Sequence, residues 1–98
     1  FFFESVDGSA NVYFNIDDNT TDADSSTVAT LSDDTYITLA AYYDGVSSVE
    51  LFADDVKITT MTSIGLPGAE MALGFGYWNG AAGAEVTDLD YVLVAKER

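Results

Sequence analysis

The chain has 98 residues, enough for one domain. It contains neither cysteine nor histidine, which excludes disulfides, thiolate metal sites and the commonest general base. Seventeen acidic residues against three basic ones give a formal net charge of −14, so we expect neither nucleic acid nor an anionic membrane surface as a partner. Such acidity is typical of proteins in a salty medium, of cation-binding surfaces and of proteins with basic partners. No apolar run approaches the ~20 residues of a transmembrane helix.

The N-terminal residues predict a β-hairpin. Residues 1–6 are the first expected strand, and Asp-Gly-Ser at 7–9 is a turn signal. Residues 11–17 are the second expected strand, because Val12, Phe14 and Ile16 alternate with polar positions. Three phenylalanines at a free terminus would be unfavourable in water, so we expect them to lie in a buried strand and the chain to be a fragment of a longer one.

Residues 17–26 are the most polar stretch and are expected to form a solvated loop. Its oxygen-bearing side chains suggest a calcium site, because hard cations take several oxygen ligands from one flexible loop. The candidate ligands are Asp17, Asn19, Asp22 and Asp24, with Asp18 beside them. The stretch lacks the glycine and the glutamate of a helix-loop-helix calcium loop. A solvated acidic loop without metal is the simpler interpretation.

A three-stranded meander is predicted over residues 35–60. A short edge strand at 27–31 and a turn at 32–34 precede it. Ile37, Leu39, Ala41 and Tyr43 share one face of its first strand, and Asp44-Gly45 supplies a tight turn. The second strand is 48–53, and the Asp-Asp pair at 54–55 turns the chain into a third strand whose period continues through Val56, Ile58 and Thr60. Such a meander needs a second sheet to cover its apolar face.

The C-terminal third predicts two more strands. Residues 59–70 are an expected connection, since glycine and proline interrupt any regular element there. Residues 71–78 and 86–95 alternate as strands, with a glycine-rich turn at 79–84 between them. No segment has helical periodicity. The sequence therefore predicts a single all-β domain over 1–98, an antiparallel β-sandwich.

From residue 35 onward the sequence resembles the C-terminal half of a concanavalin A-like (laminin-G-like) jelly roll. The similar features are Tyr-Tyr-Asp-Gly at 42–45, the hairpin that follows, Gly-Phe-Gly-Tyr-Trp-Asn-Gly at 74–80 and Asp-Leu-Asp-Tyr-Val-Leu-Val at 88–94. The Asp-Asp turn at 54–55 departs from the usual Asp-Gly. The resemblance implies a jelly-roll sandwich of which this chain is a part. It extends to accessory domains of tailed-phage virion proteins, which implies a structural role in a virion.

Two kinds of site remain open in the C-terminal third. Tyr77, Trp78 and Asn79 form a candidate carbohydrate-binding group, because sugar rings stack on aromatic faces. Core packing or subunit contact is the simpler interpretation of such aromatics. Glu85, Asp88 and Asp90 do not match the order or spacing of the carboxylates in glycosidases of this fold. We therefore expect outward-facing strand carboxylates there, and no catalysis.

The interpretation that the sequence favours is a non-enzymatic structural module of a larger assembly, in the form of a capsid-decorating or tail protein of a virion. Its expected partners are other protein subunits, with a homo-oligomer as the first candidate, and its expected place is the virion or the extracellular space. No cofactor is expected, apart from the calcium considered above. The alternative is a carbohydrate-binding module of lectin type.

Overall fold

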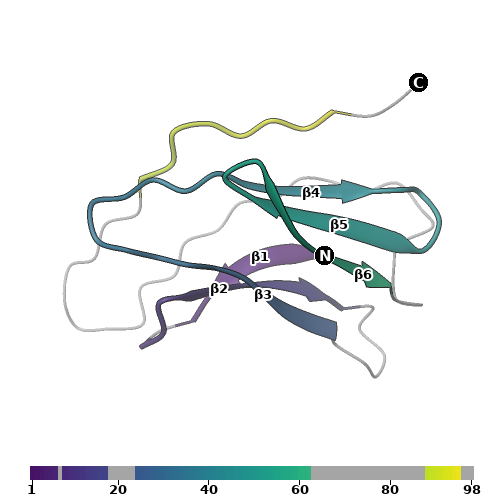
Figure 1. The fold of residues 1–98 in the computed structure, drawn as a ribbon, viewed down its shortest axis with the longest axis horizontal. Coiled ribbons are helices and arrows are strands. Elements are labelled where there is room, and N and C mark those ends of the chain that lie inside the picture. Colours follow the sequence, from purple (N-terminus) through teal and green to yellow (C-terminus); the bar gives the residue numbers. More distant parts are fainter. Residues whose placement is uncertain (7, 18–23, 63–87, 96–98) are drawn as a thin grey trace.

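The computed structural model describes residues 1–6, 8–17, 24–62 and 88–95. These residues form two three-stranded antiparallel sheets and no helix. Sheet A consists of β1 (Phe2–Ser5), β2 (Asn11–Ile16) and β3 (Asp24–Thr30). Sheet B consists of β4 (Leu39–Tyr43), β5 (Ser48–Ala53) and β6 (Val56–Thr62). Figure 1 shows the sheets as two layers, as in a β-sandwich.

Sheet A is organised around its middle strand, β2. Val12, Phe14 and Ile16 are buried there, and the residues between them are half-buried on the outer face. β1 and β3 pair with β2 on its two sides. A register shift between Val12 and Tyr13 gives β3 one extra residue, Val28, which is buried. This β-bulge supplies a further apolar side chain to the core from a strand that is otherwise mostly polar.

Sheet B has the same plan around β5. Val49 and Leu51 are fully buried, and the β4 residues on the same face, Leu39 and Tyr43, pack against the core. On the other side of β5, a register shift between Leu51 and Phe52 leaves one extra residue on β6. Because a bulge changes which side chains face inward, the shift determines which β6 residues reach the core.

The core lies between the two sheets and joins them. Phe14, Ile16 and Val28 of sheet A pack with Val49 and Leu51 of sheet B in one cluster. Fully burying a side chain of this size contributes roughly 1.5–3 kcal/mol to stability, so these five residues form the centre of the core.

Two of the three N-terminal phenylalanines, Phe1 and Phe3, extend this core with aromatic contacts, whereas Phe2 is exposed, so the expectation that all three are buried is wrong for Phe2. The ring of Phe1 has its centroid 5.5 Å from that of Phe14 and 5.9 Å from that of Tyr43, so it contacts both sheets. The ring of Phe3 meets that of Phe14 edge-on, with centroids 5.0 Å apart. Tilted and edge-on contacts at these distances are favourable, which explains why an apolar terminus is compatible with the fold.

The turn between β4 and β5 is held by one carboxylate. Asp44 Oδ1 accepts hydrogen bonds from the backbone N–H groups of Val46, Ser47 and Ser48 at 2.8, 2.9 and 3.0 Å. Its Oδ2 accepts a bond from the Ser48 hydroxyl at 2.8 Å. Gly45 has φ 79°, a conformation that glycine adopts without steric cost. The Asp-Gly pair therefore fixes both the direction and the register of this hairpin.

The predicted strands are confirmed in the middle of each sheet and differ at the ends. β5 has its predicted bounds, β2 ends one residue early, and the predicted Asp54-Asp55 turn is confirmed by positive φ at both residues. The first meander strand is shorter than predicted and begins at Leu39, because β5 ends at Ala53 and offers no partner for earlier residues. The predicted turns at 7–9 and 32–34 are confirmed at Gly8 (φ 76°) and Asp34 (φ 53°).

Three predictions are wrong in the described residues. Residues 24–26 belong to β3 and not to a loop, because they continue the ladder with β2, where Asp24 pairs with Ile16. Residues 59–62 belong to β6, and the bulge places Thr59 and Met61 toward the core instead of Thr60. Residues 88–95, most of the predicted last strand, form no strand. The predicted strand at 71–78 lies outside the described residues.

Candidate interaction site

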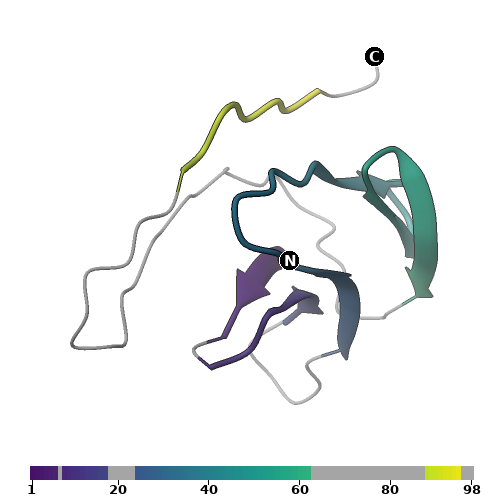
Figure 2. The ribbon, with the colours of Figure 1, turned by 60° about the vertical axis from the view of Figure 1, so that its left-hand side comes forward.

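The C-terminal segment, residues 88–95, is the most unusual part of the described surface. It contains no strand, and all eight of its residues are exposed. Its large apolar side chains are between 51% and 80% exposed; they are Leu89, Tyr91, Val92, Leu93 and Val94. Figures 1 and 2 show this segment, in yellow, as an extended trace that stands apart from both sheets. An apolar run exposed in this way marks an interaction site or an aggregation liability.

The sequence of this segment is typical of a buried strand. Tyr91, Leu93 and Ala95 alternate with Val92 and Val94, so both faces of an extended chain are apolar. Strands with two apolar faces normally lie inside a sheet whose faces are both covered. A solvated hairpin strand, in contrast, has one polar face. Residues 91–95 therefore have the chemistry of a strand that requires neighbours on both sides.

A second unusual feature is the edge of sheet B at β4. Among the described strands β4 pairs with β5 only, and its five residues, 39–43, carry no charge. Natural edge strands usually carry charges, prolines or bulges that prevent further pairing. The outer face of β4 adds Tyr42, which is 47% exposed. Within the described residues, β4 itself therefore carries no charge, proline or bulge.

The backbone of β4 directs part of its hydrogen-bonding groups away from β5. Asp54 N donates to Thr38 O at 2.9 Å, and Asp44 N donates to Ser48 O at 3.1 Å. Hydrogen-bonding positions alternate along an antiparallel strand, so Leu39 and Ala41, at the intervening positions, direct their N–H and C=O groups away from β5.

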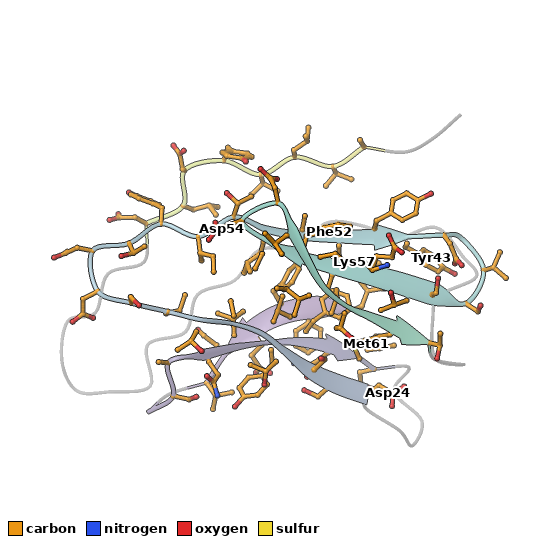
Figure 3. All side chains as sticks on the ribbon, in the orientation of Figure 1. Asp24, Tyr43, Phe52, Asp54, Lys57 and Met61 are labelled. Carbon is orange, nitrogen blue, oxygen red and sulfur yellow. The ribbon has the colours of Figure 1, made fainter. Side chains whose placement is uncertain are left out.

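The outer face of sheet B combines apolar side chains with one ion pair. Lys57 Nζ on β6 contacts Glu50 Oε1 on β5, and both side chains are partly exposed. Figure 3 labels Lys57 and Phe52 on this sheet. Ile58, the bulged residue of β6, is 45% exposed. Exposed ion pairs of this kind contribute little to stability.

The outer face of sheet A is different, because its polar side chains bond to one another. Asn15 Nδ2 donates to Glu4 Oε2 at 2.9 Å, and Thr30 Oγ1 donates to Asn11 Oδ1 at 3.2 Å. Hydrogen bonds from the side chains of Asn11 and Ser9 lower the pKa of Tyr13. We interpret this polar face as a solvated surface.

The electrostatics of the described surface are dominated by carboxylates. Backbone N–H groups, first that of Ser48 and then that of Val46, hold the pKa of Asp44 well below its usual range. That carboxylate is consequently ionised at every ordinary pH, and it serves the turn. Asp88 and Asp90 lie in the exposed C-terminal segment, not on a strand face as expected.

The candidate calcium ligands are only partly within the described residues. Asp17 follows β2 and Asp24 begins β3, so the two flank the same end of sheet A; Figure 3 labels Asp24 there. Asp18, Asn19 and Asp22 lie outside the described residues. Within the described ranges no three acidic side chains come together as metal ligands would. Calcium binding stays a prediction.

The candidate carbohydrate-binding residues, Tyr77, Trp78 and Asn79, also lie outside the described residues, as does Glu85. The sequence did not predict that residues 91–95 are exposed. The signal was available in the five consecutive uncharged residues at 91–95 and at 39–43. It was assigned to ordinary strands of one sandwich, because periodicity does not reveal whether a strand finds a partner.

Within the part of the chain that the structure describes, no helix is long and apolar enough to cross a membrane. Comparisons with protein-family models, with curated proteins and with solved structures find no match for this chain.

Proposed function

We propose that this chain is a non-enzymatic structural module that packs into a larger protein assembly, with a sandwich of jelly-roll type as its fold. The observation that carries the proposal is the exposure of the apolar segment 91–95 beside an otherwise well-packed core. Proteins keep such surface when another protein covers it. The partners in this proposal are other protein subunits.

The energetics favour contact with a partner over exposure to solvent. Burying a valine, leucine or tyrosine side chain contributes roughly 1.5–3 kcal/mol each, and residues 91–94 offer four such side chains. Association costs translational, rotational and side-chain entropy, and backbone hydrogen bonds of an added strand offset part of that cost. A contact through this short segment is therefore sufficient for specific, reversible assembly.

The charge of −14 restricts the contact to this apolar surface. Like charges over the rest of the molecule oppose nonspecific association, while the run at 91–95 carries no charge. An acidic exterior with a confined apolar contact suits a subunit that must remain soluble until it assembles. A capsid-decorating or tail protein of a virion is the specific form of this proposal, and it rests on the resemblance of the sequence alone.

Thiol labelling tests the proposal directly, because the chain has no cysteine of its own. L93C introduces one thiol in the segment, and V46C introduces a matched thiol in the β4–β5 turn, since Leu93 and Val46 are 80% and 79% exposed. We expect equal labelling rates in dilute protein, and slower labelling of L93C alone in the assembled state. Slow labelling of L93C in the dilute chain would show that the chain covers its own segment, and would contradict the proposal.

A further inference from the structure

We propose that Asp44 is a site of isoaspartate formation that the folded turn between β4 and β5 keeps unreactive, so that the modification occurs in chains whose turn has opened. The site is the Asp44-Gly45 pair, and the inference does not depend on the proposed function. Glycine has no side chain to shield its backbone nitrogen. The pair is therefore the least hindered kind of sequence for attack of a backbone nitrogen on an aspartyl side chain.

The reaction is a condensation within the chain, followed by hydrolysis. The Gly45 nitrogen attacks Cγ of the protonated Asp44 carboxyl. An N–Cγ bond forms, a Cγ–O bond breaks, and the hydroxyl leaves as water with the proton of the N–H group. Water then opens the cyclic imide: cleavage of the N–Cγ bond restores aspartate, and cleavage between the nitrogen and the Asp44 backbone carbonyl carbon gives isoaspartate. The steps release one water, take up one water and need no other reactant.

Both oxygens of the Asp44 carboxylate are engaged in the folded turn. Oδ1 accepts hydrogen bonds from the backbone N–H groups of Val46, Ser47 and Ser48, and Oδ2 accepts one from the Ser48 hydroxyl. Ring closure expels one of these two oxygens. Loss of Oδ1 removes the acceptor of three backbone N–H groups, and loss of Oδ2 removes the acceptor of the hydroxyl. Imide formation in the folded turn therefore costs hydrogen bonds that the unfolded chain does not have.

The same contacts keep the carboxyl in its unreactive form. Condensation needs the neutral acid, because a carboxylate is a poor electrophile and cannot release its oxygen as water. Hydrogen-bond donors favour the ionised form, and they lower the pKa of Asp44, with the N–H group of Ser48 as the largest cause. Each unit by which a pKa is lowered reduces the neutral fraction about tenfold at higher pH. Opening of the turn removes this protection.

The backbone of the turn is fixed as well. Asp44 N donates to Ser48 O at 3.1 Å, which closes the hairpin, and Gly45 is held at φ 79°. Closing the imide ring requires rotation about the bonds that join Cα of Asp44 to Cβ and to its carbonyl carbon. Such a rotation moves the carboxylate relative to the N–H groups that hold it. We therefore expect local opening of the turn to precede the reaction.

Isoaspartate at this position would disturb sheet B. The backbone would continue through Cβ and Cγ of residue 44, which adds one methylene group to the turn and moves the carboxylate onto Cα. Tyr43 pairs with Val49 directly beside this turn, and that register directs Val49 into the core, where it is fully buried. The modification would thus prevent an opened turn from closing again in its original register.

Peptide mapping of the whole chain by mass spectrometry, after incubation for increasing times, measures isoaspartate at each site. The second Asp-Gly pair of the sequence, at 7–8, calibrates the rate in concentrated urea. We expect the two pairs to react at similar rates in urea, and Asp44 to react at least about tenfold more slowly in the folded chain. At intermediate urea concentrations the rate at Asp44 should rise with the unfolded fraction that circular dichroism measures.

Two serine variants provide a matched comparison. S48A removes the hydroxyl that donates to Oδ2, whereas S47A changes a residue that gives Asp44 its backbone N–H, which alanine retains. We expect faster isoaspartate formation in folded S48A than in folded S47A, and equal rates in urea. A rate in folded S48A no higher than that in S47A would contradict the role of the Ser48 hydroxyl. Equal rates at Asp44 in the folded and the unfolded wild type, a comparison that needs no variant to fold, would overturn the inference.

Discussion

Strand β5 and the C-terminal segment are both rich in apolar residues and have opposite surroundings. β5 lies between β4 and β6, and its Val49 and Leu51 are fully buried. Residues 91–95 are at least as apolar, yet they have no strand beside them in the described structure and are exposed. The comparison shows that apolar residues in an extended segment favour burial but do not determine which strand pairs with that segment. A turn such as that at Asp44 supplies the partner for β5.

The largest expected difference between these regions is in stability. L51A should lower the free energy of unfolding by about 2–5 kcal/mol, because it leaves a cavity in the core between the sheets. L93A should change it by less than about 0.5 kcal/mol, because an exposed side chain makes few contacts. Urea denaturation of the dilute proteins measures both. Equal losses in the two variants would show that the segment is packed in its own chain.

The next largest effect is expected at the turn between β4 and β5, which brings these two strands side by side. D44A should lower the melting temperature, because it removes the acceptor for the N–H groups of Val46, Ser47 and Ser48. D44N keeps one side-chain oxygen and should have a smaller effect. Thermal unfolding followed by circular dichroism makes the comparison, and a melting temperature unchanged in D44A would contradict this role of the turn.

The same carboxylate predicts a dependence on pH. The pKa of Asp44 is lowered in the folded state, so its contribution to stability is present above the unfolded value of about 3.9 and is lost as the pH falls through the folded value. The wild type should lose stability below about pH 4 more steeply than D44A does. Parallel acid titrations of the melting temperature would reveal the difference, and identical curves would contradict it.

The sequence predicted those features of the fold that depend on residues close together in the chain, and it did not predict those that depend on pairing between distant strands. The alternation in β2 and β5 and the local turn chemistry at 44–45 and 54–55 gave correct strands, because their causes lie within a few residues. The two bulges were missed, since they depend on pairing between strands; they determine why Val28 is buried and Ile58 is exposed. The exposure of residues 91–95 was missed for the same reason.

A smaller effect is expected at the turn between β5 and β6. Asp54 and Asp55 have φ of 48° and 64°, a left-handed conformation that is unfavourable for most residues and easy for glycine. Glycine at 55 would relieve left-handed strain of roughly 1–2 kcal/mol, and the greater entropy that glycine gives the unfolded chain would offset about 0.4–1 kcal/mol of this gain, so D55G should stabilise the protein slightly. G45A, in the other turn of sheet B, should have the opposite sign, because Gly45 has φ 79°. Destabilisation by D55G in urea denaturation would show that the aspartate side chain is needed there.

The smallest expected effect is that of calcium. Of the candidate ligands only Asp17 and Asp24 lie within the described residues, so calcium binding stays a prediction; the simpler interpretation, a solvated acidic loop, predicts that calcium or EDTA leaves the melting temperature unchanged. Binding to the folded chain would raise the melting temperature by an amount that increases with the calcium concentration. If calcium raises the melting temperature and D24N abolishes the rise, the acidic stretch binds calcium and Asp24 is one of its ligands.

Amide hydrogen exchange of the dilute wild-type protein tests the contrast between β5 and the C-terminal segment most directly. The account predicts strong protection at 49–51, exchange at 91–95 close to that of an unstructured peptide, and protection of 91–95 in the assembled state. Strong protection of 91–95 in the dilute monomer would contradict the account, because it would mean that the chain already supplies its own last strand with a partner.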